Sequence, residues 1–150
     1  MALSTEDRQR FLGVLAKAVP EELERLWEAL GLGPTYRHLR APESGLVMLR
    51  GRVSGTGAPF NMGEMTVTRC SVVLANGTIG HGYVGGTDTR HAEIVALCDA
   101  LLQGEAYRAE IERGVIAPLV AVRDAARQRT AARTAATRVE FFTVAREVGA

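Results

Sequence analysis

GLVMLRGRVSGTGAPFNMGEMTVTRCSVVLANGTIGHGYVGGTDTRHAE, residues 45–93, is the stretch that decides the fold. Apolar and polar residues alternate over 46–53 and over 64–74, which predicts two strands. The dipeptide Asn76-Gly77 is the strongest short signal for a hairpin turn. It predicts a third strand over 78–84, antiparallel to the second. The middle of the chain is therefore expected to form an antiparallel sheet.

The side chains on these strands indicate which faces are covered. Gly80 and Gly82 leave one face of the third strand bare, which predicts that another element packs closely there. Arg50 and Arg52 share a face of the first strand and form a candidate anion-binding site, because guanidinium groups bind phosphate and carboxylate oxygens. A solvated sheet face is the alternative for these two arginines.

A glycine-rich segment joins the first two strands. Its glycines, at positions 55, 57 and 63, surround Phe60. Their spacing matches neither the dinucleotide-binding fingerprint nor the phosphate-binding loop that ends in Gly-Lys-Ser/Thr. Phe60 is expected either at an exposed loop tip, as a partner-docking residue, or inside, as a lid over the core.

Two helices are predicted before the sheet, over 4–19 and over 20–30, from their capping residues and the helical spacing of their apolar residues. Trp27 is expected in the core. A short strand over 35–40 and a turn over 42–45 are predicted to lead into the middle stretch.

The chain after residue 104 is predicted to be helical, with a break near Gly114 and Pro118. Its later part is mostly alanine, arginine and threonine. The pairs Arg123/Arg127 and Arg129/Arg133 are four residues apart and form two basic rows. An alanine face is too thin to hold a long helix strongly to a core, so this helix is expected to need a partner or to lie against a protein surface.

The chain ends in an apolar and aromatic segment that would be an exposed patch unless it docks. The sequence therefore yields a set of partner-interface candidates: Phe60, Phe141, Phe142, Arg123 and Arg127. For the same reason the isolated chain is expected to self-associate.

These elements predict an α+β fold. An antiparallel sheet of three to five strands is flanked by two N-terminal helices, a central helix and a long C-terminal helix. We expect one domain over 1–150, with a helical lead over 1–33, the sheet over 35–88, a helix over 89–104, and a C-terminal helix and tail over 105–150.

Composition narrows the function classes. The 150 residues are 47% hydrophobic and 23% charged, with a net charge of +1, which is typical of a globular domain without a strong attraction to polyanions. Aromatic residues are 5% of the chain, and no nucleic-acid-binding module is recognisable. No signal peptide or apolar run of membrane-spanning length is found, and Cys70 and Cys98 are not in a Cys-x-x-Cys pair. A cytoplasmic protein with reduced thiols, without nucleic-acid or membrane partners, is expected.

The clearest enzyme-like motif is His91-Ala92-Glu93, at the start of the helix that Asp88 or Thr89 can cap. Zinc deaminases have a histidine ligand and a glutamate acid/base at this spacing, and they need two more cysteine ligands. Cys98 follows two helical turns after His91, about 10 Å away, and cannot share a metal ion with it. Cys70 alone leaves the ligand set one short, so no metal site is predicted.

Several motifs in the chain resemble the PhnG family of the bacterial carbon–phosphorus lyase system. They occur in the family's order along nearly the whole chain: 43–47 (ESGLV), 55–66 (GTGAPFNMGEMT), Thr68-Arg69, 80–84 (GHGYV), 86–93 (GTDTRHAE), 117–119 (APL) and 138–143 (RVEFFT).

The resemblance implies a subunit of a core complex with PhnH, PhnI and PhnJ. Together with PhnL, such complexes transfer an alkylphosphonate onto the ribose C1′ of ATP and displace adenine, forming ribose 1-methylphosphonate 5-triphosphate. Later cleavage of the carbon–phosphorus bond is implied to use an iron–sulfur cluster and S-adenosylmethionine in PhnJ. No cofactor is implied for the PhnG subunit itself, which is expected to be inactive alone.

Two hypotheses follow for the polar residues of the middle stretch. In the first, the chain is a non-catalytic subunit whose polar side chains shape the sheet or an interface. In the second, some of them reach a shared active site and bind phosphate or phosphonate oxygens, the candidates being Arg69, Arg90, His91 and Glu93. A stand-alone, deaminase-like enzyme that acts on nucleotides through His91 and Glu93 is the remaining alternative.

Overall fold

The computed structural model describes residues 3–139. The elements, in chain order, are α1 (Thr5–Leu15), α2 (Pro20–Leu30), β1 (Tyr36–Arg52), β2 (Pro59–Leu74), β3 (Ile79–Gly85), α3 (Thr89–Gln103), α4 (Arg108–Ile111), the π-helix η1 (Glu112–Ile116) and α5 (Ala117–Ala136). The strands form one antiparallel sheet in the order β1-β2-β3. The predicted α+β class is confirmed.

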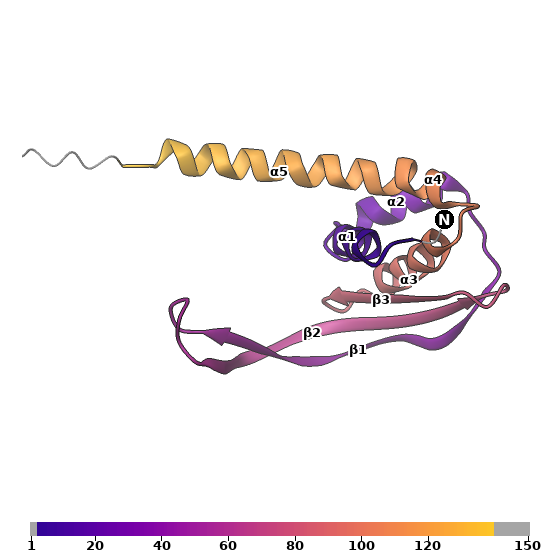
Figure 1. The fold of residues 1–150 in the computed structure, drawn as a ribbon, viewed down its shortest axis with the longest axis horizontal. Coiled ribbons are helices and arrows are strands. Elements are labelled where there is room, and N and C mark those ends of the chain that lie inside the picture. Colours follow the sequence, from indigo (N-terminus) through magenta and orange to yellow (C-terminus); the bar gives the residue numbers. More distant parts are fainter. Residues whose placement is uncertain (1–2, 140–150) are drawn as a thin grey trace, which may run out of the picture.

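The fold has two layers. In Figure 1 the helices lie on one side of the sheet, and no described element covers the other side. Helix α3 lies on the sheet, where Gly80 and Gly82 are buried beneath it. A Cβ atom on either glycine would overlap a backbone carbonyl oxygen of α3, that of Ala96 or of Ala92. The predicted close packing on this strand face is confirmed.

Helices α1 and α2 cover α3 from above, and the core lies between these three helices and the sheet. Trp27 is buried there, as predicted. The prediction that the first helix reaches residue 19 is wrong, because α1 ends at Leu15. Val19 precedes a proline, which disfavours helical backbone, and it has extended geometry and is 58% exposed.

The predicted turn over 42–45 is also wrong, because β1 is one continuous strand of 17 residues. Its register against β2 shifts between His38 and Arg40, and again between Arg40 and Glu43. The second shift places Ala41 and Pro42 in a bulge of this edge strand. A bulge on an edge strand accommodates a proline, which has no N–H to donate to a neighbour.

Strands β1 and β2 continue well beyond the part of the sheet that α3 covers. Strand β3 pairs with β2 only over Val67–Val73, so residues 46–66 form a two-stranded ribbon, here called the hairpin arm. Phe60 lies within β2 and is 43% exposed, so the prediction of a loop over 55–63 is wrong from Pro59 onward. The arm carries exposed large apolar side chains: Leu46, Met48, Leu49, Val53, Phe60, Met62 and Met65.

The predicted break near Gly114 is wrong. The chain stays helical from Arg108 to Ala136, and η1 lies where the break was expected. Gly114 lies against the side chain of Leu30, which would have to shift to admit a Cβ atom. Of the residues in α5, Leu119 alone is buried, so this helix has little contact with the core. The expected weak attachment is confirmed.

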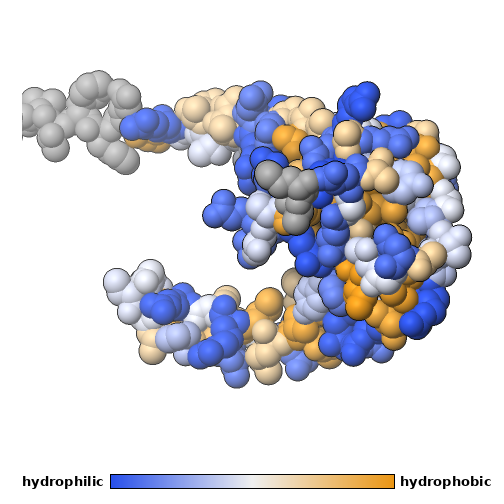
Figure 2. Space-filling model, turned by 45° about the vertical axis from the view of Figure 1, so that its right-hand side comes forward, coloured by the Kyte–Doolittle hydropathy of each residue, from blue (hydrophilic) through white to orange (hydrophobic). Residues whose placement is uncertain are grey.

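Helix α5 and the hairpin arm project from the body on the same side (Figure 1), and a hollow separates them in the space-filling view of Figure 2. Phe141 and Phe142 lie outside the described residues. Among residues 3–139, no helix combines the length and the apolar character needed to cross a membrane.

Candidate functional site

The carboxylate of Glu93 is the centre of a polar cluster between the start of β1 and the first turn of α3. Tyr36 Oη and His38 Nε2 each donate to Glu93 Oε1 at 2.9 Å, and Arg90 Nη1 donates to Oε2 at 3.0 Å. Arg90 also donates from Nε to Glu24 on α2, at 3.1 Å. We call Glu24, Tyr36, His38, Arg90 and Glu93 the Glu93 cluster.

Charges in the Glu93 cluster stabilise one another. Burial alone would raise the pKa of Glu93, but the hydrogen bonds from Tyr36, Arg90 and His38 outweigh it and hold that pKa below its usual value. Burial would likewise lower the pKa of Arg90, and its hydrogen bonds to Glu93 and Glu24 raise it instead. Glu93 is therefore an ionised acceptor with both oxygens engaged, which suits a fixed contact between elements better than proton transfer.

Sequence reasoning missed Tyr36 and His38. They lie 57 and 55 residues from Glu93 in the chain. Their spacing on one strand face was the only local signal, and it did not identify the helix that they meet.

His91 lies in a different environment from Glu93. Asp88 caps α3 by accepting a hydrogen bond from the His91 backbone N–H at 2.8 Å. The imidazole is buried, and its Nε2–H donates to the backbone carbonyl of Leu15 at 2.8 Å. Residues two apart on a helix point to different sides, so the imidazole faces α1 while Glu93 faces β1. The structure does not bring these two side chains together.

The two cysteines are buried and free. Burial, with a smaller contribution from the charge of Glu93, raises the pKa of Cys70 to about 11, and burial also raises the pKa of Cys98. Both are protonated at neutral pH, whereas a metal ligand or nucleophile must be a thiolate. Within the described part of the chain, no three His, Cys, Asp or Glu side chains are grouped as a metal site would require.

Arg69 is on the sheet face that the helices leave open. Its Nη2 donates to Glu43 at 3.0 Å, and Glu43 also accepts from Arg40 at 2.7 Å. On the same face, Ser71 Oγ and His81 Nδ1 are 2.9 Å apart. Neighbours of Arg69 in β2 point the other way and are buried, so Arg69 does not join the Glu93 cluster.

Arg50 and Arg52 lie near the end of the hairpin arm and are exposed. Neither forms a side-chain hydrogen bond or ion pair with another residue in the range 3–139. The structure thus spreads the predicted anion-binding residues over three places: the arm, the open sheet face and the Glu93 cluster.

A second polar contact that sequence reasoning missed ties the helices to the sheet. Asp99 on α3 is buried and accepts two hydrogen bonds from Arg8, at 2.7 Å each. It also accepts from the backbone N–H of His81 on β3, at 2.8 Å. The hydrogen bond with Asp99 is the main cause that raises the pKa of Arg8.

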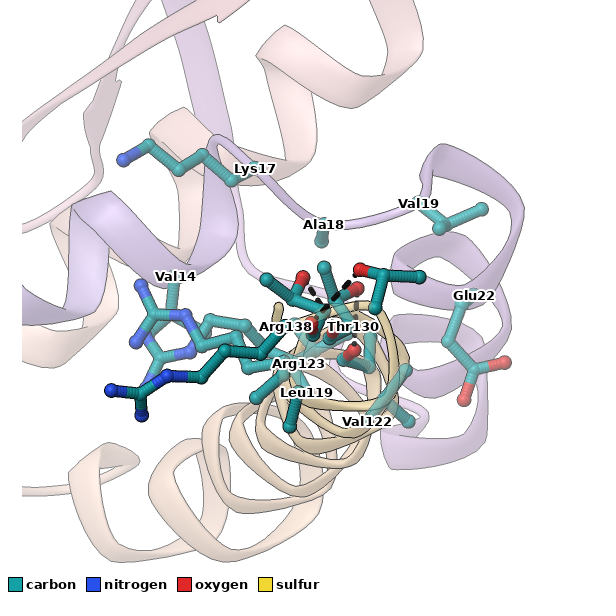
Figure 3. A pocket seen from close by; sticks show the side chains of 16 residues that line it. Val14, Lys17, Ala18, Val19, Glu22, Leu119, Val122, Arg123, Thr130 and Arg138 are labelled. Carbon is teal, nitrogen blue, oxygen red and sulfur yellow. Dashed lines mark hydrogen bonds between the residues drawn. The ribbon is translucent and has the colours of Figure 1, made fainter. Parts of the chain in front are cut away.

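Arg123 and Arg127, predicted at a partner interface, line an apolar groove beside α5. One wall is α5, and the other is the end of α1 with the connection to α2. Figure 3 shows Val14, Lys17 and Val19 beside the helix. The groove has a volume of about 1060 Å³, and Arg123 Nε donates to Asp124 Oδ1 at 3.1 Å beside it.

Comparisons with known proteins agree along nearly the whole chain. Residues 6–147 match the family model described as "Phosphonate metabolism protein PhnG". A protein of Rhizobium meliloti (strain 1021) is 46% identical over 140 residues, which are 93% of this chain and 88% of that protein. That relative is named alpha-D-ribose 1-methylphosphonate 5-triphosphate synthase subunit PhnG.

Proposed function

Because this chain belongs to the PhnG family of phosphonate metabolism proteins, we propose that it is a subunit of the enzyme complex that forms α-D-ribose 1-methylphosphonate 5-triphosphate. The observation that carries the proposal is the 46% identity to a named subunit of this synthase over 93% of the chain. The reaction is the transfer of an alkylphosphonate to the ribose C1′ of ATP with release of adenine. It takes place in the cytoplasm.

In this role the chain supports the reaction without catalysing it alone. Its partners are PhnH, PhnI, PhnJ and PhnL. ATP is the substrate of the whole complex, and the iron–sulfur cluster and S-adenosylmethionine belong to a partner. The Glu93 cluster supports a structural role, because Tyr36, His38 and Arg90 all bind the same carboxylate.

The unpartnered surfaces support a role within a complex. The hairpin arm exposes Phe60 and Met62, and the groove beside α5 is apolar. The outer face of the sheet has no described element over it. Exposed apolar surface of this extent is typical of a protein that binds partners.

The test is reconstitution of the complex from its purified subunits, with this chain as the variable component. The double variant Arg50→Ala/Arg52→Ala removes two exposed guanidinium groups, and Arg69→Ala removes a third on the open sheet face. We expect each variant to assemble and to support adenine release at close to the wild-type rate. Normal assembly with a collapse of adenine release would show that these residues bind substrate oxygens.

His91 needs a conservative replacement, because its buried imidazole holds the carbonyl of Leu15. His91→Gln keeps a side-chain N–H donor. We expect an assembled and active complex, with some loss of stability in this subunit.

The stand-alone alternative is tested on the isolated chain. With adenosine or ATP as substrate we expect neither ammonia nor adenine to be released. Steady turnover by the isolated wild-type chain that Glu93→Gln abolishes would establish the deaminase-like alternative in place of the subunit role.

A further inference from the structure

The groove beside α5 has the form of a binding site for a helix. Its α5 wall runs from Leu119 to Ala135. At 1.5 Å per residue this wall is about 24 Å long, which matches between four and five helical turns. Leu119, Val122 and Ala126 recur on it at intervals of three and four residues. The facing wall contributes Val14, Ala18 and Val19 (Figure 3), and in Figure 1 α5 continues well beyond α1 and α2. The rest of the α5 face is uncovered by described residues.

The charged residues that line this groove are mostly basic. Four of the lining residues are basic: Lys17, Arg123, Arg127 and Arg138. The lining carboxylate, Glu22, already accepts two hydrogen bonds from Arg25, at 2.6 and 3.0 Å. Arg123 donates to Asp124 on the same helix at 3.1 Å, whereas Lys17 and Arg127 form no ion pair with another residue in the range 3–139. Positive charge therefore remains beside an apolar floor, and an acidic occupant is complementary to it.

Backbone chemistry distinguishes a helix from an extended segment. Both walls consist mainly of helices, whose backbone groups are already paired within the helices. An extended segment in the groove would leave its own N–H and C=O groups without partners, whereas a helix satisfies them internally.

We propose that this groove receives an amphipathic α-helix from another subunit of the phosphonate complex. The apolar face of that helix lies against α5, and its aspartate or glutamate side chains pair with Lys17, Arg123 and Arg127. This inference rests on the proposed function, because it takes the helix from a partner in that complex. Figure 2 shows a hollow between the projecting α5 and the hairpin arm, where a partner has room to approach.

A second copy of this chain fits the groove poorly. The acidic helix α2 has its apolar residues Leu23, Leu26 and Trp27 buried in the core, so they are not accessible. Pairing α5 with α5 would bring the arginines of two copies together, and like charges in contact are unfavourable. Complementarity thus favours a different subunit.

The two basic rows of α5 provide a matched test of charge. Arg123 and Arg127 line the groove, whereas Arg129 and Arg133, with the same spacing on the same helix, do not. We expect Arg123→Glu/Arg127→Glu to weaken binding of the full chain to the purified complex of the other subunits by about tenfold or more. Arg129→Glu/Arg133→Glu is expected to change it by less than about threefold, with circular dichroism checking that both variants keep their helices. Equal effects of the two double variants would overturn the proposal.

The occupant is identified by photo-cross-linking in the assembled complex. Benzoylphenylalanine in place of Ala131 points into the groove, and the same residue in place of Ala132 is the control, because Ala132 does not line it. We expect position 131 to cross-link to an acidic, helical segment of another subunit, identified by mass spectrometry. Cross-links to residues 139–150 of the same chain, or to a second copy, would overturn the proposal.

Binding of the wild-type chain to the other subunits distinguishes failure of the proposed function from failure of the groove assignment. If the wild-type chain does not join the other subunits, the proposed function fails. If it joins them, but the Arg123/Arg127 variant joins equally well and position 131 yields no cross-link to another subunit, only the assignment of the groove fails.

Discussion

At the scale of single residues, two glycines set the distance between the sheet and its covering helix. Gly80 and Gly82 lie directly beneath the backbone of α3, and a Cβ atom on either would overlap a carbonyl oxygen of that helix. Backbone atoms in a packed helix cannot move aside as the end of a side chain can. The helix that holds the Glu93 cluster and Asp99 is therefore positioned by the absence of two side chains.

Gly82→Ala is expected to destabilise the fold by about 2 kcal/mol or more, because it overpacks a contact between two backbones. Urea denaturation of the isolated chain measures the change. Gly85→Ala is the control in the same strand. A Cβ atom there meets nothing within 4 Å, so the effect should stay within about 0.5 kcal/mol. Equal effects of the two substitutions would contradict the close contact between Gly82 and the backbone of α3.

Glu93→Gln is expected to lower the free energy of unfolding at pH 7 by about 1–3 kcal/mol, because three donors lose a charged acceptor. The pKa of Glu93 in the fold is below its usual value of 4.5, so its ionisation stabilises the fold above that pH. The contribution is lost as the pH falls through the lowered pKa. The difference between the wild type and Glu93→Gln should accordingly shrink below about pH 4.5.

Denaturation series at pH 7 and at pH 3.5 check this behaviour. Glu24→Gln is a suitable control, because Glu24 is 43% exposed and pairs with Arg90 on the surface. Its effect should remain below about 1 kcal/mol. A difference for Glu93→Gln that persists unchanged at low pH would show that the charge of Glu93 is not what stabilises the cluster.

At the scale of elements, the hairpin arm is a strand pair that exposes apolar side chains without a layer to cover them. Such ribbons are marginally stable alone. Residues 36–45 of β1 and 67–74 of β2 form the part of the sheet that β3 and α3 anchor. The hairpin arm continues from this part. The apolar side chains of the arm contribute little to the core and are therefore available to a partner. Binding to a partner would account for the exposure of both Phe60 and Met62 on one strand.

Phe60→Ser/Met62→Ser is expected to leave the melting temperature of the isolated chain nearly unchanged, because these side chains are 43% and 65% exposed. It should weaken assembly with the partner subunits by about tenfold, because two apolar contacts of an interface are lost. Differential scanning fluorimetry and binding measurements separate the two effects. A fall in melting temperature without a change in assembly would place these residues in the fold instead of an interface.

At the scale of the whole molecule, the body carries two projecting elements on one side. Helix α5 bears the arginine rows, the hairpin arm bears the apolar side chains, and a hollow lies between them (Figure 2). This division supports a subunit whose helical and sheet layers hold the shape, while its projections contact partners.

The isolated chain is expected to self-associate through its aromatic ending. Analytical ultracentrifugation should give a mass above the 16.1 kDa of one chain, in a concentration-dependent manner. Phe141→Ser/Phe142→Ser should shift the distribution toward the monomer, because two aromatic side chains are replaced by polar ones. A wild-type chain that stays monomeric at high concentration would contradict this expectation.

The amino-acid sequence by itself determined the features that depend on neighbouring residues. The Asn76-Gly77 hairpin, a cap of α3 by Asp88 or Thr89 and the glycine-bare face of β3 were predicted, because each is set by contacts or patterns a few residues long. The family was also accessible from the sequence, since its motifs follow one another along the chain.

Only the tertiary structure decided which distant side chains meet. Tyr36 and His38 reach Glu93, and Arg8 reaches Asp99 across 91 residues, because the packing of β1, α1 and α3 brings them together. The continuity of β1 across Pro42 depends on pairing with β2, which overrides a local turn signal. The groove beside α5 likewise requires the placement of α1 against it, so the sequence indicated a basic helix in need of a partner but not the site that it lines.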